Sequence, residues 1–503
     1  MLITGTTYSV SHYKEFEKTG NKDIFENIID SMIMDGIAGM NESFRRAISS
    51  LPKDKKRLAI LSILDKDRNL FAKIKESITD INLSKIDHVK NIILMLREYV
   101  KIAEVEKKKF GEVMTPLDLV KEMLNTLPTE VWSNPNLKWL DPANGTGPFP
   151  AVVIYKLMKG LESWEPDADK RYKHIIENMI YVCELQPKNM FLYLCTVDPK
   201  DELACNIYTG SFLEEGFDYH MKNVWGVEKF DIVIGNPPYQ DGTKTQGKNS
   251  SLWTKFIIKS NSYINKYLLF ITPFSWIAPS ETQKNELKDV FFKNNLIELN
   301  TECSKYFNVA STFSYFLIEK SDCYKSTKVS NYQFNLNLPF LPKKICIESI
   351  SICKKIFFSD DKKLDFSCGL RNDNISEEGN YFVWYGNNLK KSDILGKNWS
   401  KKKVIVNKPG YLNPRFDDGL YNTSANNYWV EVNDKKEADN LISFFNTKLS
   451  SKIIENLCKY SGYNSLGVLK RLPAILLDNR WDDKNMATYF GLTKEELDFL
   501  EKL

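Results

Sequence analysis

Between residues 109 and 322, short apolar runs alternate with segments that are mostly long enough to form helices. A repeated strand, helix, strand order implies a largely parallel sheet with helices on both faces, because parallel strands need a long crossover connection. Ligands of such sheets bind beyond the carboxyl ends of the strands, so we expect the chemistry there. The predicted fold class is α/β, with a mostly parallel sheet of seven strands. The candidate strands are residues 138–140, 180–182, 206–208, 230–234, 267–271, 296–299 and 313–318.

The regions on either side of this alternation have different patterns. Apolar residues recur at three- and four-residue steps over 88–105, which is typical of an amphipathic helix. After residue 322, Asn, Tyr, Ser and Lys become frequent and the pattern is irregular, with a helical end around 487–502. A chain of 503 residues exceeds what one hydrophobic core usually serves. We predict a helical domain over 1–108, a parallel-sheet domain over 109–322 and a mixed α/β domain over 323–503.

The composition is that of a soluble globular protein. Apolar residues make up 43% of the chain and charged residues 27%. No run approaches the roughly 18 apolar residues of a membrane helix, and the first residues lack the pattern of a secretion signal. We therefore expect a cytoplasmic protein without a membrane partner. The net charge of +4 is small, so any surface for nucleic acid must come from local clustering of basic residues.

Metal binding is not expected. The four His residues lie far apart, and no pair of Cys residues has the Cys-x-x-Cys spacing. Zinc sites usually require such close spacings of Cys and His ligands. We predict that the chain holds no structural or catalytic metal.

A glycine-rich turn follows the first candidate strand. It begins at Asp141, contains Gly145 and Gly147, and is followed by the helical run 151–158. The two glycines let the backbone approach a ligand closely, and the helix N-terminus favours a nearby carboxylate or phosphate. Many nucleotide-binding folds have such a turn, so a purely structural turn is also compatible with the sequence.

An acid ends the second candidate strand. Glu184 stands where a carboxylate accepts hydrogen bonds from the ribose hydroxyls of an adenosine-bearing cofactor. Taken singly, Glu184 fits an exposed surface acid equally well.

The tetrapeptide Asn236-Pro237-Pro238-Tyr239 follows the fourth candidate strand. Two prolines stiffen the backbone and remove two donors, which leaves carbonyl groups able to accept. An Asn side-chain oxygen, a Pro carbonyl and an aromatic ring together suit a planar heterocycle that carries an amino group. The tetrapeptide is therefore the candidate catalytic motif.

These segments together resemble the S-adenosylmethionine-dependent DNA adenine-N6 methyltransferases. The order of cofactor motif, catalytic motif and C-terminal recognition domain is similar to the gamma arrangement in that family, which includes enzymes of restriction–modification systems. The segment Phe110-Gly111-Glu112-Val113-Met114-Thr115-Pro116 resembles the family segment that precedes the first strand. The resemblance covers residues 109 to about 320, and the remainder resembles target-recognition domains only loosely.

The resemblance implies a Rossmann-like methyltransferase domain over 109–322, a DNA target-recognition domain over 323–503, and S-adenosylmethionine as cofactor. Where the family usually has Gly-Asp-Phe after the third strand, this chain has Gly210-Ser211-Phe212. Ser211 would accept the bond from the cofactor adenine as a neutral group, and Phe212 would offer its ring for stacking. The implied cofactor-binding residues are Thr115, Pro116, Asp141, Pro142, Ala143, Asn144, Gly145, Gly147, Glu184, Ser211 and Phe212. The implied catalytic residues are Asn236, Pro237, Pro238 and Tyr239.

The expected reaction is methylation of an adenine that has been flipped out of duplex DNA. Asn236 Oδ1 and the Pro237 carbonyl would each accept one N–H of the adenine amine and so direct its lone pair toward the methyl group. Tyr239 is the expected stacking face. Phe313 is a candidate second wall, although a core aromatic is the favoured interpretation for that residue.

Several alternatives share the same motif. RNA methyltransferases and protein glutamine methyltransferases also use Asn-Pro-Pro-Tyr, and a cytosine-N4 enzyme more often has Ser-Pro-Pro. The chain also fits the modification subunit of a complex with a restriction or specificity partner. A fused nuclease has no convincing signature in residues 1–108. The sequence does not decide between a monomer and a homodimer.

Two further segments are candidates for contact with DNA. The polar segment 240–249 follows the catalytic motif, and we predict a loop that orders on DNA, with an idle surface loop nearly as compatible. A lysine-rich stretch in the C-terminal region has the clustering expected of a DNA-facing surface, with a plain solvated face as the alternative. Its lysines are Lys390, Lys391, Lys397, Lys401, Lys402, Lys403 and Lys408, with Trp399 and Tyr411 nearby.

Overall fold

The computed structural model describes residues 115–185, 187–198, 203–239, 252–279, 283–306, 313–460 and 462–503. The predicted helical domain over 1–108, the loop at 240–249 and residues 109–114 lie outside the described residues. The chain divides into two units. The first contains the residues up to 273 together with 287–327, and the second contains 274–286 together with 328–503.

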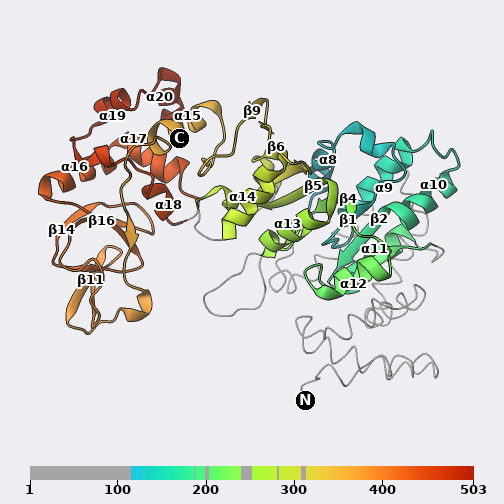
Figure 1. Cartoon of the computed structure of the whole chain (residues 1–503), viewed down its shortest axis with the longest axis horizontal. Helices are drawn as coiled ribbons and strands as arrows, with labels where there is room; N and C mark the ends of the chain where they lie inside the picture. Colours follow the sequence, from blue (N-terminus) through green and yellow to red (C-terminus); the bar gives the residue numbers. More distant parts are fainter. Residues whose placement is uncertain are drawn as a thin grey trace, which may run out of the picture. The chain divides into compact units, whose positions relative to one another are not determined.

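A central sheet, of which strands β1 to β7 lie in the first unit, organises that unit, which Figure 1 draws in blue through yellow. All seven predicted strands are present at the expected places. The sheet also contains two three-residue strands that the sequence did not predict, so it has nine strands rather than seven. The strands are β1 (Trp139–Asp141), β2 (Ile180–Glu184), β3 (Asn206–Thr209), β4 (Phe230–Gly235), β5 (Ile264–Pro273), β6 (Asn295–Asn300), β7 (Phe313–Glu319), β8 (Thr327–Val329) and β9 (Tyr332–Phe334).

The sheet is mixed, with the order β3-β2-β1-β4-β5-β7-β6-β8-β9. Strands β1 to β5 pair in parallel, whereas β7 runs antiparallel to both β5 and β6. In the parallel part, the chain crosses from β1 outward to β2 and β3 and then returns to β4 on the other side of β1. This reversal of strand order next to β1 is the place where open α/β sheets bind their ligands.

Helices connect these strands, as the alternation of the sequence predicted. Helix α9 is apolar nearly all round and is buried along most of its length, which is typical of a helix enclosed between a sheet and other helices. Its core includes Val152, Val153, Ile154 and Leu157, which join the cluster formed by the strands. The helices of this region are α8 (Leu117–Leu124), α9 (Pro148–Gly160), α10 (Ala168–His174), α11 (Pro187–Val197), α12 (Glu215–Asn223), α13 (Leu252–Tyr263) and α14 (Gln283–Lys293).

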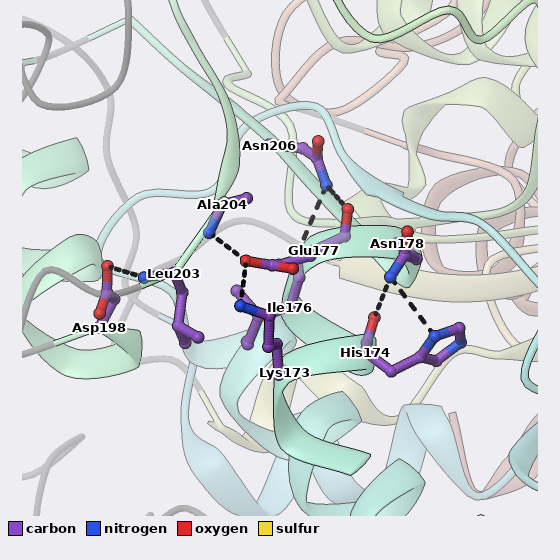
Figure 2. A network of polar contacts seen from close by, with 9 residues as sticks. All are labelled: Lys173, His174, Ile176, Glu177, Asn178, Asp198, Leu203, Ala204 and Asn206. Carbon is purple, nitrogen blue, oxygen red and sulfur yellow. Dashed lines mark hydrogen bonds and ion pairs between the residues drawn. The ribbon is translucent and has the colours of Figure 1, made fainter. Parts of the chain in front are cut away.

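A polar network fixes the approach to β2 and β3 at their amino ends (Figure 2). A π-helical turn over Ile175–Met179 leads into β2, and the side-chain amide of Asn206 donates to carbonyls of Ile176, Glu177 and Ile180. The Glu177 carboxylate accepts from the backbone N–H of Ala204 at 2.7 Å. Backbone groups at a strand entrance need such partners when they leave the regular ladder. The network therefore has a structural role at the edge opposite the carboxyl ends.

The second unit has its own core and two small sheets. The larger sheet has the order β10-β16-β13-β14, and the smaller has the order β12-β11-β15. The strands are β10 (Ser367–Cys368), β11 (Tyr381–Tyr385), β12 (Asn388–Ser392), β13 (Lys402–Asn407), β14 (Arg415–Asp418), β15 (Asn422–Thr423) and β16 (Asn427–Glu431). The helices are α15 (Ile347–Phe357), α16 (Lys435–Phe445), α17 (Lys448–Ser451), α18 (Leu466–Leu469), α19 (Asp483–Tyr489) and α20 (Lys494–Glu501).

This second unit agrees with the predicted mixed α/β character and with the helical end of the chain. One segment differs from the expected division. Residues 274–286 group with the second unit, although the sequence placed them in the parallel-sheet domain. Their attachment includes a backbone hydrogen bond from Leu341 N–H to the Ile277 carbonyl at 3.1 Å. Such a pairing between distant segments leaves no local pattern in the sequence.

Candidate functional site

The predicted site residues converge at the carboxyl ends of β1, β2, β3 and β4. These four strands are parallel neighbours, so their carboxyl ends lie at one edge of the sheet. Asp141 ends β1, Glu184 ends β2, and Asn236 directly follows β4. Thr115 reaches the same edge from the segment that precedes α8, because Asn236 Nδ2 donates to Thr115 Oγ1.

The glycine-rich turn after β1 adopts the conformation that its sequence predicts. Gly145 and Gly147 have φ angles of +56° and +91°, a region that favours glycine. A Cβ atom at Gly147 would lie 2.6 Å from the ring of Tyr193, whereas one at Gly145 would meet no atom within 4 Å. Gly145 thus faces open space, and Gly147 allows the turn to pack closely before α9 begins.

Asp141 lies beneath this turn and close to Gly235, which directly precedes the candidate catalytic motif. Its side chain is 2% exposed, Oδ1 accepts from the backbone N–H of Ala143, and Oδ2 has no hydrogen-bond partner among the described residues. A Cβ atom on Gly235, which has a φ of +149°, would lie 2.8 Å from Asp141 Oδ1. Burial raises the pKa of Asp141 from 3.8 to about 7, and the Ala143 N–H opposes this rise.

Replacement of Asp141 by Asn should change how stability depends on pH. Between pH 3.8 and about 7 the folded protein holds a proton on Asp141 that the unfolded chain releases. The free energy of unfolding therefore falls as pH rises through this interval, by at most about 1.4 kcal/mol per pH unit, and levels off above it. Urea unfolding of the cofactor-free protein from pH 5 to 8 should show this slope in the wild type and lose it in Asp141→Asn.

An exposed carboxyl provides the control for this pH experiment. Asp169 is exposed in the first turn of α10, so Asp169→Asn should keep the wild-type slope. Parallel pH profiles for the wild type and Asp141→Asn would contradict the raised pKa.

Glu184 binds the glycine-rich turn in this structure. Its Oε2 accepts from the backbone N–H of Gly145 at 2.7 Å, and its own carbonyl accepts from Gly210 N–H at 3.0 Å. Glu184 therefore links the ends of β1, β2 and β3. The carboxylate is 6% exposed, so the structure does not support the interpretation of Glu184 as an exposed surface acid.

The hydroxyl and the backbone N–H of Ser211, which follows β3, both form hydrogen bonds with residues close by in the sequence. Its Oγ accepts from Leu213 N–H at 3.2 Å, and its backbone N–H donates to the Glu214 carboxylate at 3.1 Å. The same carboxylate oxygen accepts from the hydroxyl of Tyr208 at 2.6 Å. Glu214 therefore supplies a carboxylate near the position where the resembling family has Asp. The Ser-x-x-Glu spacing of a capping box was the available signal for it in the sequence.

Phe212 is a core residue in this structure, which differs from the predicted stacking role. Its ring is 1% exposed and packs edge-on against Phe217 at 4.9 Å between centroids. Phe256 lies at 5.3 Å, and the Lys259 ammonium lies 5.3 Å from the ring centre. A ring enclosed in this way offers no open face to a cofactor. The Gly-Ser-Phe pattern could not reveal the aromatic partners, which come from α12 and α13.

The candidate catalytic motif holds the Asn236 carboxamide between two hydroxyl groups. Asn236 Nδ2 donates to Thr115 Oγ1 at 3.1 Å, and Asn236 Oδ1 accepts from the Tyr239 hydroxyl at 2.7 Å. The Tyr239 ring packs against Phe313 with 5.1 Å between centroids and 35° between planes. Phe313 is 2% exposed, so it is a core aromatic that supports Tyr239. Burial raises the pKa of Tyr239, so the phenol stays a neutral donor.

The residues at this edge fit a cofactor with donor groups and positive charge. Two buried acceptors, Asp141 Oδ2 and Asn144 Oδ1, have no partner among the described residues. Buried polar atoms usually have hydrogen-bond partners, so these two indicate a missing donor. S-adenosylmethionine carries an ammonium group, ribose hydroxyls and an adenine amine as donors. Gly145 faces open space beside these atoms.

The lysine-rich stretch of the C-terminal region is not a uniform basic surface. Lys403 is buried in an ion pair with Asp417, Lys390 pairs with Glu377, and Lys401 pairs with Glu431. Lys402 lies 3.7 Å from Asp418. Most of these carboxylates come from other strands or loops, so the cluster of positive charge seen in the sequence is largely neutralised in the fold.

Neither a metal cluster nor a membrane span is found in the described part of the chain. No group of three or more His, Cys, Asp or Glu side chains there is arranged to hold a metal ion. None of the described helices is both long and apolar enough to cross a bilayer.

Part of the chain is similar in sequence to known methylases. Residues 169–308 match the family model described as Eco57I restriction-modification methylase. A protein of Mycoplasma pneumoniae (strain ATCC 29342 / M129 / Subtype 1) described as an uncharacterized adenine-specific methylase is 28% identical over 318 residues. That match covers 49% of this chain and 74% of the relative.

One solved structure shows a similar fold over most of the chain. The DrdV–DNA complex matches with a TM-score of 0.51 and 10% identity, over 92% of this chain and 68% of that chain. A modification subunit of a putative type I restriction enzyme from Vibrio vulnificus YJ016 matches with a TM-score of 0.34 and 14% identity, over 48% of this chain. The match spans about half of that subunit, 52% of its length. Residues 169–308 are therefore similar to the Eco57I restriction-modification methylases, and the chain that carries them has an α/β methyltransferase-like fold with a mixed sheet.

Proposed function

We propose that this chain is a DNA adenine methyltransferase, which transfers the methyl group of S-adenosylmethionine to N6 of an adenine flipped out of duplex DNA. The observation that carries the proposal is the Asn236 carboxamide, which is held at the carboxyl end of β4 by Thr115 and Tyr239. The Eco57I-type match of residues 169–308 and the adenine-specific methylase of M. pneumoniae support the same class of enzyme.

In this proposal, the turn after β1 and the end of β2 bind the cofactor. The cofactor supplies an electrophilic methyl group on a sulfonium. Asp141 and Asn144 accept from its donor groups through their unpartnered oxygens, and Gly145 lets the backbone approach it. Glu184, already held by Gly145 N–H, offers a carboxylate for ribose hydroxyls, since an ionised carboxylate accepts up to about four hydrogen bonds. The remaining proposed cofactor-binding residues are Pro116 before α8, Pro142, Ala143 and Gly147 in the turn after β1, and Ser211 after β3.

The catalytic motif positions the adenine amine. Asn236 Oδ1 and the Pro237 carbonyl each accept one N–H, which draws the nitrogen toward tetrahedral geometry and directs its lone pair at the methyl carbon. A bound cofactor would supply the methyl group, so that one N–C bond would form as one S–C bond breaks, and the nitrogen would then release a proton to solvent. Pro238 keeps the backbone rigid, and the Tyr239 ring supports the base. Catalysis of this kind depends on positioning and fixed dipoles rather than on a strong base.

The direct test is transfer of a labelled methyl group from S-adenosylmethionine to duplex DNA, to RNA and to a protein extract. We expect label in duplex DNA, recovered as 6-methyladenine after digestion. Label in RNA or in protein would contradict the proposed substrate and point to the alternative acceptors of the same motif. An absence of label on every acceptor would contradict the proposal for the chain acting alone and point to a required partner subunit.

We further propose that the second unit contacts DNA through one face of the β11–β12 hairpin. Paired residues of antiparallel strands share a face, so Phe382 lies beside Lys391 and Trp384 beside Leu389. Phe382 is 50% exposed and Leu389 is 45% exposed. The Lys391 ammonium lies 5.9 Å from the Phe382 ring centre, and no carboxylate of the described residues forms an ion pair with it. The hairpin face thus joins two exposed apolar side chains, Phe382 and Leu389, to a cation without an ion-pair partner among the described residues.

The hairpin is held rigidly by the neighbouring sheet. Its turn begins at Gly386, whose N–H donates to Asn427 Oδ1 and whose carbonyl accepts from Arg415 at 2.7 Å. The Arg415 guanidinium lies 4.3 Å from the Trp384 ring centre. A two-stranded ribbon fits the major groove of DNA, where lysine pairs with phosphate and apolar groups contact thymine methyls.

Two adjacent lysines allow a matched test of this face. Lys391→Gln should weaken binding to duplex DNA and reduce the dependence of log K on log salt by about one, as expected for the loss of one phosphate contact. Lys390 lies on the opposite face and pairs with Glu377 at 2.7 Å, so Lys390→Gln should leave the salt slope unchanged. Titrations of duplex DNA at several salt concentrations measure both slopes. Equal slopes for the two variants would contradict the assignment of the face.

A further inference from the structure

We infer that Thr115 is a positioning residue for the reaction, which acts by fixing the orientation of the Asn236 carboxamide. This inference deepens the proposed function and rests on it for the identity of the acceptor. The sequence assigned Thr115 only to cofactor binding. In the structure its hydroxyl oxygen accepts from Asn236 Nδ2 at 3.1 Å, although the two residues are 121 positions apart.

The orientation of a carboxamide matters because its two ends have opposite roles. The oxygen accepts hydrogen bonds and the nitrogen donates them, so a rotated Asn236 would present N–H groups to the N–H groups of the base. Two contacts of Asn236 define the productive orientation. Thr115 Oγ1 engages Nδ2, and the Tyr239 hydroxyl engages Oδ1. The Tyr239 contact must be shared or exchanged when the adenine amine arrives, whereas the Thr115 contact lies on the nitrogen and can persist.

Thr115 is itself well placed for this task. Its side chain is 3% exposed, and the next residue, Pro116, caps α8 with its carbonyl accepting from Val120 N–H at 3.0 Å. Helix α8 buries Leu117, Leu119, Val120, Met123 and Leu124 in the core of the first unit. A hydroxyl at the start of a docked helix loses little freedom when it binds the amide. The arrangement therefore couples the segment before α8 to the acceptor at the end of β4.

The test compares Thr115→Val, which removes the hydroxyl at nearly constant shape, with Thr115→Ser, which retains it. At saturating S-adenosylmethionine, Thr115→Val should lower kcat roughly ten- to a hundredfold, the range expected when a reacting group is misplaced. Thr115→Ser should restore kcat to within about threefold of wild type, since it keeps the acceptor oxygen. Thr126→Val is the matched control, because Thr126 lies just after the same helix and, among the described residues, its Oγ1 bonds only the Met123 carbonyl.

Measurements of cofactor affinity and of thermal unfolding distinguish a positioning role of Thr115 from a role in cofactor binding and from a purely structural role. Equilibrium binding of S-adenosylmethionine to Thr115→Val should stay within about threefold of wild type, and its thermal unfolding should stay cooperative. Unchanged kcat at saturating cofactor, with a weakened affinity, would overturn the inference and leave Thr115 as a cofactor residue. Failure of Thr115→Ser to rescue kcat would also overturn it. The comparison uses whichever acceptor the wild type labels, so a wrong choice of DNA as substrate would not affect its outcome.

Discussion

Replacement of Asn236 by Ala should reduce methyl transfer roughly 10²–10³-fold at saturating cofactor and DNA, the loss typical of removing one fixed dipole from a reacting group. The variant removes the oxygen proposed to accept from the adenine amine, and it also leaves the hydroxyls of Thr115 and Tyr239 without their shared partner. Single-turnover transfer to duplex DNA measures the chemical step directly. Binding of S-adenosylmethionine should change little, because Asp141, Asn144 and the glycine-rich turn remain.

Two companion variants distinguish the loss of the Asn236 oxygen from the loss of a neighbouring hydroxyl and from the general effect of replacing an Asn. Tyr239→Phe keeps the ring against Phe313 and removes only the donor to Asn236 Oδ1, so it should retain activity within about tenfold of wild type. Asn223→Ala changes an exposed Asn that bonds the Tyr219 carbonyl, so it should behave like wild type. Activity above a tenth of wild type in Asn236→Ala would contradict the role of this residue as the acceptor. A loss of cofactor binding in that variant would assign its defect to a different step.

The parallel part of the fold was predictable because each strand there carries its own pattern. Apolar runs of several residues, bounded by turns and separated by helix-length segments, identify β1 to β7 without reference to distant residues. Strands β8 and β9 have three residues each and include exposed positions, so they carry no period of their own. They form because β6 offers an edge, as Thr327 Oγ1 bonding to the Leu296 carbonyl illustrates. A sheet edge is a tertiary feature that a local pattern does not record.

In the candidate site, too, the features with a local sequence pattern were predictable and those that depend on distant contacts were not. Parallel strands bring their carboxyl ends together, so the sequence was enough to predict that Asp141, Glu184 and Asn236 meet at one edge. The contact of Asn236 with Thr115 depends on how α8 docks, and the burial of Phe212 depends on rings from α12 and α13. These contacts between segments far apart in sequence decide which atoms of the predicted residues are available.

The lysine-rich stretch shows how far a local cluster of charge can mislead. Lys403 lies in β13 and its side chain is 0% exposed, while the side chain of its partner Asp417 in β14 is 1% exposed. The Lys403 ammonium pairs with the Asp417 carboxylate and also donates to the Asn398 and Lys401 carbonyls at 2.9 and 3.1 Å. Asp417 accepts in turn from the Leu420 N–H at 2.9 Å. Burial lowers the pKa of Lys403, while the Asp417 carboxylate opposes that change.

Lys403→Met should therefore destabilise the second unit by about 3–5 kcal/mol, because it leaves the Asp417 carboxylate buried without a counter-charge. Lys402→Met changes the adjacent and exposed lysine, whose carboxylate partner is 3.7 Å away, and should cost less than about 1 kcal/mol. The double variant Lys403→Met with Asp417→Asn removes both charges and keeps an acceptor for the Leu420 N–H. Its free energy of unfolding should exceed that of Lys403→Met alone by roughly 1 kcal/mol or more, which is the coupling energy expected of contacting residues. Urea unfolding of the full chain, followed by the fluorescence of its tryptophans, measures all three. Equal losses for Lys403→Met and Lys402→Met would show that the pair is not buried, and would return Lys403 to the surface that the sequence predicted.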